Sequence, residues 1–297
     1  MMFRFTIIIC IFLFSSSLNF NATPPQKGKK QTQKKKAGKK TTKSTIKWKS
    51  LSEGLDYAEI KAPVYSRVND NLITALKINP KFYKFELASS SENDSVEYTV
   101  QDWCALKGLT AGINACMYKL KQDQTSMGFM KNYNHYNNPE FRHVYRAMLA
   151  FNRIDNSVPE FMIIDLDHDD WKHLAPKYNT FVQNIKMVDA NGKRSSWKKK
   201  KGLRSSMVVM ATDADNNVLF LFTRSPYSID VFSSMLLSLP LDIKRAAYLE
   251  GGPESSFYVN TKDTLVEKVG SYVYPGWTTD LNKEFRKLPN IIGVKKK

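Results

Sequence analysis

The stretch Ser206-Met-Val-Val-Met-Ala-Thr-Asp-Ala-Asp-Asn-Asn-Val-Leu-Phe-Leu-Phe-Thr-Arg224 decides the fold class of this chain. It contains two apolar runs that are rich in β-branched and aromatic residues, and the polar pair Asp215-Asn216 lies between them. Such a pattern is typical of two strands joined by a tight turn. We therefore predict a β-hairpin here, within a strand-rich domain.

Further strands and helices are predicted on both sides of this hairpin. Lys81-Phe-Tyr-Lys-Phe-Glu-Leu-Ala88 alternates between polar and apolar residues with a period of two, which indicates a strand. Thr99 to Gly108 fits a short helix, with Thr99 as its N-cap and Gly108 as its stop. Ile229 to Leu239 is predicted to be an amphipathic helix. The other predicted elements are strands at residues 55–62, 72–78, 109–118, 161–165 and 180–188, and a helix-like segment at 170–178.

These elements together predict an α+β fold, in which a strand-rich mixed sheet carries packed helices within a single catalytic-type domain. The chain has 297 residues and is 42% hydrophobic, which is enough apolar material for a real core. We place the domain at residues 48–297, because the pattern of short strands begins near Trp48. Residues 119–159 show little periodicity and are predicted to be irregular, which inside a compact domain usually marks a functional loop.

Residues 1–22 have the pattern of a secretory signal peptide. Arg4 supplies one positive charge, residues 5–14 are mostly apolar, and small polar residues follow them. An apolar run of about ten residues is too short to cross a bilayer, because a spanning helix needs about 20. We therefore predict export followed by cleavage, and a secreted, periplasmic or cell-envelope location.

Residues 23–47 are rich in lysine and lack periodic apolar positions, which predicts a disordered linker. The net charge of the whole chain is +17, and 12 of these charges come from Arg4 and the eleven lysines up to Lys49. The rest of the chain carries only +5, so no nucleic-acid partner is expected. The linker is either a tether to an anionic envelope polymer or membrane surface, or a solvated spacer.

Two cysteines, Cys104 and Cys116, remain after removal of the signal peptide. In an oxidising compartment they can form a disulfide, and two buried free thiols are the alternative. No spacing of cysteine and histidine supports a zinc site. The acidic residues between Asp165 and Asp170 fit a helix N-terminus better than a calcium loop, so neither a metal nor another cofactor is predicted.

The turn Glu250-Gly-Gly-Pro-Glu254 is the first candidate for chemistry. Its two glycines allow positive φ angles and let backbone N–H groups come close to a ligand. Glu250 and Glu254 flank the glycines, where a carboxylate can transfer protons or position a sugar hydroxyl. The alternative is a strand-to-helix turn with solvated acids.

Three further places carry polar groups that suit a ligand. Asn114 is the polar residue of a predicted buried strand, so its amide needs partners or a ligand. Arg224 stands at a strand end, where it either clamps an anion such as phosphate or belongs to an ordinary loop before a capped helix. Lys131 and Asn132 begin a stretch, up to Tyr136, that mixes rings, amides and a cation. That mixture is suited to sugar binding, and a plain surface loop is the alternative.

Taken in order, these segments resemble the phosphodiester glycosidase domain family from about Trp48 to the C-terminus. Asn114-Ala-Cys-Met-Tyr118 looks like the family's Asn-Ala-Gly-Met-Phe strand, and Glu250-Gly-Gly252 looks like its Asp-Gly-Gly turn. Arg224-Ser-Pro-Tyr-Ser228 and Tyr248-Leu-Glu-Gly-Gly-Pro-Glu254 are similar to connected blocks of a bacterial branch. The chain departs from the family pattern at two positions. Cys116 stands in place of a glycine, and Glu250 stands in place of an aspartate.

The resemblance implies an enzyme that hydrolyses a sugar 1-phosphodiester, such as an N-acetylglucosamine-1-phosphodiester, in envelope or extracellular glycans. The anomeric bond breaks through an oxocarbenium-like state, which a carboxylate and nearby cations stabilise. Glu250 is the first choice for the catalytic carboxylate, and Glu254 is the second. The implied substrate-binding groups are Asn114, Lys131, Asn132, Arg224, Gly251, Gly252 and Ser255.

A second class of function is compatible with the same fold. A non-catalytic protein can bind envelope glycans and use the lysine-rich linker as its tether. Such a binder retains affinity for sugar phosphates and hydrolyses none of them, so turnover distinguishes the two functions.

Overall fold

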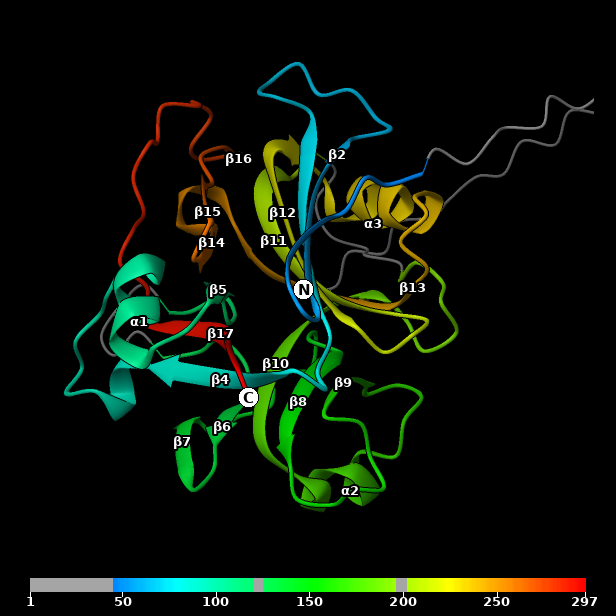
Figure 1. The fold of residues 1–297 in the computed structure, drawn as a ribbon, viewed down its shortest axis with the longest axis vertical. Helices are drawn as coiled ribbons and strands as arrows, with labels where there is room; N and C mark the ends of the chain where they lie inside the picture. Colours follow the sequence, from blue (N-terminus) through cyan, green and yellow to red (C-terminus); the bar gives the residue numbers. More distant parts are fainter. Residues whose placement is uncertain (1–44, 120–124, 196–201) are drawn as a thin grey trace, which may run out of the picture. The chain divides into compact units, whose positions relative to one another are not determined.

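The computed structural model describes residues 45–119, 125–195 and 202–297. Residues 43–297 group into one compact unit. The described residues form two β-sheets and three α-helices. Figure 1 shows how these elements are arranged. The predicted strand-rich α+β fold is therefore confirmed.

The larger sheet has twelve strands, and its main path runs β1-β2-β3-β12-β11-β13-β10-β6-β7. β8 pairs with β10 and β9 pairs with β8, while the short β16 pairs with β11. Its strands are β1 Lys49–Ser52, β2 Leu55–Lys61, β3 Leu72–Ile78, β6 Met130–Asn132, β7 His135–Asn138, β8 Ala147–Arg153, β9 Phe161–Asp165, β10 Tyr178–Val188, β11 Arg204–Asp213, β12 Val218–Tyr227, β13 Ile243–Gly251 and β16 Val273–Tyr274.

The smaller sheet has five strands in the order β15-β14-β5-β17-β4. Its strands are β4 Tyr83–Ser89, β5 Ala111–Asn114, β14 Ser256–Thr261, β15 Thr264–Val269 and β17 Asn290–Lys296. β17, near the end of the chain, pairs antiparallel with β4 and β5, so it joins early and late segments. This sheet brings the predicted strand of Asn114 next to the segment that follows the Glu250 turn.

The main hydrophobic core lies between the two sheets. Phe85 of the smaller sheet packs against Phe161 and Phe220 of the larger sheet, with ring centroids 4.8 and 6.4 Å apart. Burying such rings removes a large apolar area from water and is the main force that holds the sheets together.

Helices cover the outer faces of both sheets. α3, Ile229–Ser238, buries Phe232 and Leu236 in a cluster with Leu221 of the larger sheet. α1, Val100–Lys107, buries Trp103 in a cluster with Ile291 of the smaller sheet. The domain is therefore layered as helix, sheet, sheet and helix.

The local predictions around these elements are confirmed. Thr99 caps α1 by accepting the N–H of Asp102, and Gly108 ends it in the left-handed conformation with φ 63°. Ser228 caps α3. The predicted hairpin is formed by β11 and β12, and Asn216 in its turn has a φ of 63°.

The prediction of an irregular segment at residues 119–159 is wrong for its described part. Residues 130–132 and 135–138 form the β6–β7 hairpin, and residues 147–153 form β8 at the centre of a three-strand group with β9 and β10. The five residues from Ala147 to Phe151 are fully buried. A strand covered on both faces lacks the period-two alternation that marks a half-exposed strand, so periodicity gave no signal there.

Several predictions fall outside the described residues. These are the signal peptide at 1–22 and nearly all of the linker at 23–47. Within the described residues, no helix is both long and apolar enough to cross a membrane.

Candidate active site

Glu250 lies at the end of β13, where the strand runs into a short 3-10 turn, Gly252–Glu254. Its backbone is opposite Val208 of β11, which belongs to the core between the sheets. The pairing shifts between Val208 and Val209, so Glu250 stands at a β-bulge, a feature that often re-aims a side chain next to an active site. The residue is only 8% exposed, and its Oε1 accepts the N–H of Gly251 over 2.9 Å. The first candidate carboxylate is therefore an interior group.

Burial controls the protonation of this carboxylate. Loss of hydration raises the pKa of Glu250 well above its usual value, and the neighbouring Glu254 carboxylate adds to the rise. The hydrogen bond from the Gly251 N–H acts in the opposite direction. Glu250 therefore keeps its proton at pH values that ionise a surface glutamate, which is the state of a proton donor.

Asn114, at the end of β5, reaches this turn from the smaller sheet. Its Nδ2 donates to the backbone oxygen of Glu254 over 2.9 Å, and its Oδ1 accepts the N–H of Ser256 over 2.7 Å. Both polar atoms of the amide thus have partners in the protein backbone. Asn114, predicted to hold ligand oxygens, holds the candidate turn in place.

The two glycines of the turn are required for different reasons. A Cβ at Gly251 would lie 2.1 Å from the Tyr248 hydroxyl oxygen and 2.7 Å from Ser205 Oγ, so there is no room for a side chain. Gly252 has a φ of 80°, in the left-handed region that favours glycine. Close packing at one position and backbone conformation at the next explain the Gly-Gly pair.

Tyrosine hydroxyls and one thiol surround Glu250. Burial, followed by the charge of Glu250, raises the pKa of Tyr118 and of Tyr248. Burial raises the pKa of Tyr145 to about 12, with Glu250 among the smaller contributions. Cys116 donates to Ser126 Oγ over 3.2 Å, and burial raises the pKa of its thiol to about 12. These groups stay protonated at neutral pH and can donate hydrogen bonds.

Arg286 lies beside the second carboxylate. Its Nη1 is 3.6 Å from Glu254 Oε1, and its guanidinium lies 5.3 Å from the ring centroid of Trp277. Arg286 and Trp277 are 41% and 42% exposed, whereas Glu250 is buried. The site therefore combines an interior carboxyl group with a carboxylate, a cation and an aromatic ring that solvent can reach.

A family model described as phosphodiester glycosidase matches residues 107–295, which include all of these groups. The chain belongs to the phosphodiester glycosidase family. The matched region covers the turn at Glu250 and its partner Asn114 as well as Arg286, so the resemblance noted from the sequence is confirmed. A search of curated proteins gives no match.

Two solved structures have the same fold. A hypothetical protein from Synechocystis aligns with a TM-score of 0.59 and 12% identity, over 86% of this chain and 64% of that one. This chain thus spans less than two thirds of that protein. The catalytic domain of zebrafish N-acetylglucosamine-1-phosphodiester alpha-N-acetylglucosaminidase, auto-inhibited by its pro-peptide, aligns with a TM-score of 0.55 and 8% identity, over 86% of this chain and 85% of that one.

Within this phosphodiester glycosidase domain, the guanidinium of Arg224 has several protein partners. Its Nη1 donates to Val269 O, and its Nη2 donates to the backbone oxygens of Asp280 and Asn282. Nη2 also lies 3.0 Å from Asp280 Oδ1. The guanidinium predicted to clamp phosphate therefore holds the segment around residue 280 against β12.

Lys131 and Asn132 lie on β6, at a distance from Glu250 along the larger sheet. Lys131 pairs with Phe181 of β10, four residues before Ile185, which pairs with Tyr248. Four residues of strand correspond to about 13 Å. Asn132 donates to Glu92 and accepts from Thr180, and Lys131 lies over the ring of Tyr136. Among the described residues, neither of them forms a hydrogen bond or an ion pair with Glu250.

Ser255 lies on the turn and is fully buried. Its Oγ has no hydrogen-bond partner among the described residues, while its backbone N–H donates to Gly252 O over 3.1 Å. Of the predicted substrate-binding side chains, Ser255 is the one that the structure places directly on the Glu250 turn with an unused polar atom.

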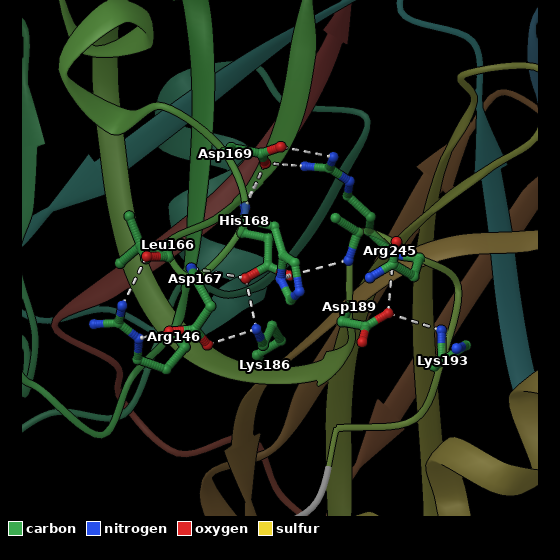
Figure 2. Close-up of polar contacts among 12 residues, drawn as sticks. Arg146, Leu166, Asp167, His168, Asp169, Lys186, Asp189, Lys193 and Arg245 are labelled. Atoms are coloured by element: carbon green, nitrogen blue, oxygen red, sulfur yellow. Dashed lines mark hydrogen bonds and ion pairs between the residues drawn. The ribbon is translucent and has the colours of Figure 1, made fainter.

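The acidic cluster at residues 165–170 is a network of ion pairs, as Figure 2 shows. Lys186 Nζ lies 2.5 Å from Asp165 Oδ1 and 2.7 Å from Asp167 Oδ2, and Arg146 contacts Asp167 from the other side. Arg245 of β13 forms a bidentate contact with Asp169. The described residues contain no group of three or more acidic, histidine or cysteine side chains with the arrangement of a metal site. The cluster ties β9, β10 and β13 together.

The sequence predicted that the acidic residues of this cluster stand at a helix N-terminus, and one of them does. Asp170 caps the short helix α2, Trp171–Leu174, by accepting the N–H of His173. The other carboxylates pair with cations that are distant in sequence, which a local pattern cannot show. Cys104 and Cys116 are both free and buried, so the alternative of two free thiols holds.

Sequence reasoning missed several groups of the site. Arg286 and Trp277 lie in a C-terminal segment with little regular structure, and no motif marked them. Tyr145 stands in the stretch that was predicted to be irregular. All three residues are far from Glu250 in the sequence. Long-range pairing of strands, such as that of Ile185 with Tyr248, decides which distant segments meet at the Glu250 turn.

Proposed function

We propose that this protein is an exported glycosidase that hydrolyses a sugar 1-phosphodiester, such as an N-acetylglucosamine-1-phosphodiester, in envelope or extracellular glycans. The observation that carries the proposal is the pair formed by the buried Glu250, whose pKa is raised by burial, and the Glu254 carboxylate beside Arg286. Membership of the phosphodiester glycosidase family supports the substrate class. The signal-peptide pattern of residues 1–22 supports export.

The proposed reaction breaks the bond between the anomeric carbon and the phosphate oxygen. The leaving group is a phosphomonoester, whose second pKa is about 6. A carboxyl group with a raised pKa is matched to protonate such a group, so we assign Glu250 as the general acid. Its proton goes to the phosphate oxygen as that bond breaks.

Glu254 is assigned to activate the water that attacks the anomeric carbon. The water oxygen forms the new bond to carbon, and its proton passes to the Glu254 carboxylate. Arg286, exposed beside Glu254, is placed to neutralise the phosphate charge, and a guanidinium suits phosphate through parallel hydrogen bonds. The hydroxyls of Tyr118 and Tyr145 supply further donors near the reacting groups.

The predicted substrate contacts of Ser255, Arg224, Lys131 and Asn132 stay predictions, and the structure shows which of these side chains already have protein partners. Ser255 has an unused hydroxyl on the turn and supports a substrate contact there. Arg224, Lys131 and Asn132 have protein partners, and we therefore place Arg286 before Arg224 as the phosphate-binding cation. The lysine-rich segment at residues 23–47 is proposed to tether the enzyme to an anionic envelope polymer or membrane surface.

The test is hydrolysis of a panel of sugar phosphodiesters, including UDP-N-acetylglucosamine, by the protein without residues 1–22. Glu250→Gln is expected to lower kcat at least 100-fold, because general acid catalysis contributes about 10²–10⁴. Glu267→Gln on β15 is the matched control, since Glu267 is exposed and should leave kcat unchanged.

Two further variants separate the cations. Arg286→Ala is expected to raise KM for phosphodiesters strongly. Arg224→Ala is expected to act mainly on stability and to lower the melting temperature. Full activity of Glu250→Gln would overturn the assignment of the acid. Binding of sugar phosphates without turnover of any panel member would establish the non-catalytic glycan-binding function instead.

A further inference from the structure

Three buried amide atoms near the end of β5 have no hydrogen-bond partner among the described residues. They are Nδ2 and Oδ1 of Asn290 and Oδ1 of Asn184. The two residues are 2% and 0% exposed. A buried amide without partners loses the hydrogen bonds that water gave it, so native proteins rarely retain one without a use.

The side chain of Asn290 points between the two sheets. Asn290 is the first residue of β17, and its neighbours two and four positions along, Ile292 and Val294, belong to the core between the sheets. Side chains two apart in a strand share a face, so Asn290 faces the same interior. Ser89, its partner on β4, has its hydroxyl bonded to Ser91 and Asn137. The strand pairing therefore leaves the Asn290 amide unused.

Asn184 approaches the same place from the larger sheet. Its Nδ2 donates to the backbone oxygen of Ala115 over 3.0 Å, which leaves its Oδ1 as an unused acceptor. The N–H of the same Ala115 donates to the backbone oxygen of Asn290 over 3.3 Å. The side chain of Asn184 and the backbone of Asn290 therefore both bond Ala115, the residue that follows β5.

That residue lies within the candidate active site. Ala115 is preceded by Asn114, which holds the Glu250 turn, and followed by Cys116. Unused donors and acceptors thus belong to two residues that bond Ala115, next to the residue that holds the Glu250 turn.

We propose that Asn290, together with Asn184, forms a binding site for a polar substituent of the sugar ring and so positions the anomeric carbon at Glu250. This inference rests on the proposed function. One amide offers a donor and an acceptor side by side, and the second offers an acceptor. The complementary ligand group both donates and accepts, so the site takes a ring hydroxyl or a secondary amide.

The first experiment compares stability with turnover. Asn290→Leu removes no side-chain hydrogen bond that the described residues form, so its melting temperature should equal or exceed that of the wild type. Its kcat/KM should fall at least 100-fold, since a site built to bond a polar group depends strongly on that bond. Asn137→Leu is the control, because Asn137 is also buried but bonds Ser89, Ser91 and Ser126. That variant should melt several degrees lower.

The second experiment uses the wild type and does not depend on a folded variant. Methyl phosphodiesters of N-acetylglucosamine and of its 3-deoxy, 4-deoxy and 6-deoxy analogues, and of glucose and 2-deoxyglucose, are compared by kcat/KM. One missing substituent should cost the wild type at least 100-fold, and that selectivity should disappear in Asn290→Leu. Equal rates on all sugars, or an unchanged selectivity in Asn290→Leu, would overturn the inference.

A binding measurement separates this inference from the proposed function. Calorimetric titration of Glu250→Gln with N-acetylglucosamine 1-phosphate and glucose 1-phosphate reports sugar binding without turnover. If the wild type hydrolyses no phosphodiester but binding is lost on adding Asn290→Leu, the proposed function fails and the sugar site stands. If neither sugar phosphate binds, the sugar site is overturned.

Discussion

The side-chain nitrogen of Asn114 donates to the backbone oxygen of Glu254 over 2.9 Å, and this bond joins the two sheets of the domain at the candidate active site. Asn114 ends β5 of the smaller sheet, whereas Glu254 ends the turn that follows β13 of the larger sheet. The second bond of the amide, to the N–H of Ser256, fixes the start of β14 as well. One side chain thus determines where the turn with both candidate carboxylates lies.

Asn114→Ala removes both of these bonds and is expected to destabilise the protein by about 2–3 kcal/mol, because buried backbone groups lose their partners. Activity should fall as well, since the turn loses its support from the smaller sheet. Urea denaturation measures the first effect. Asn191→Ala, at an exposed turn, should change stability by less than about 0.5 kcal/mol. A stable Asn114→Ala variant with full activity would contradict this role.

Gly251→Ala is expected to destabilise the protein through a steric conflict that a second substitution relieves. The new methyl group would lie 2.1 Å from the Tyr248 hydroxyl oxygen. Tyr248→Phe deletes that oxygen, so the double variant should recover part of the melting temperature lost by Gly251→Ala alone. Ser205 Oγ, at 2.7 Å, limits the recovery. Additive losses in the two single variants and the double variant would show that this contact is not the cause.

The raised pKa of Glu250 makes the stability of the protein depend on pH in a defined direction. The folded pKa lies above the unfolded value of about 4.3, so the folded state binds the extra proton between these two values. The contribution of Glu250 is complete below about pH 4.3 and is lost as pH rises through the folded pKa.

Glu250→Gln has no proton to lose, so its melting temperature should rise relative to that of the wild type as the pH increases from 4 to 8. Glu267→Gln, at an exposed position, should show a difference from the wild type that does not change with pH. A pH-independent gap for Glu250→Gln would mean that Glu250 is ionised in the folded protein.

Asp165 is expected to show the opposite dependence. Burial on its own raises the pKa of Asp165, but hydrogen bonds from Lys186 and from the N–H groups of Ala190 and Asp167 lower it to about 2. The resulting stability is present above the unfolded value of about 3.9 and is lost as pH falls toward 2.

Asp165→Asn should therefore destabilise the protein by about 2 kcal/mol at pH 7 and by less as pH falls below about 3.9. Chemical denaturation at pH 7, pH 4 and pH 3 measures this difference. Asp215→Asn, at the exposed hairpin turn, is the control and should stay close to the wild type at each pH. An equal loss at all three values would point to packing instead of charge.

Cys104 and Cys116 should react slowly with a thiol reagent at pH 8 while the protein is folded. Both thiols are buried and free, and burial raises the pKa of each to about 12, so little thiolate is present. Both should react quickly in denaturant. Recovery of no reactive thiol after unfolding would show that the two residues had formed a disulfide.

The sequence predicted those parts of the fold that local physics determines. Thr99 and Gly108 mark the ends of α1 because a hydroxyl cap and a left-handed glycine act within a few residues. The hairpin of β11 and β12 follows from two apolar runs and a turn. β8 escaped prediction because it is buried on both faces and shows no alternation.

The candidate site was predictable at the Glu250 turn and at Asn114, which bonds that turn. The partners of Arg224, Asp280 and Asn282, lie more than fifty positions later in the chain, so a strand-end arginine could not be told from an anion clamp by pattern. Arg286 was not predicted as a site residue, because its place beside Glu254 depends on how the C-terminal segment folds back. Long-range contacts decide both cases, and neighbouring residues do not encode them.

The origin of the site in two separate sheets has a mechanical consequence. Glu250 belongs to the larger sheet, whereas Asn114 and Asn290 belong to the smaller one. A slip of one sheet over the other by a fraction of a residue spacing would leave most of the core in contact, yet it would take the acid out of reach of the sugar. A shift of one sheet relative to the other is therefore expected to lower the catalytic rate well before the domain begins to unfold.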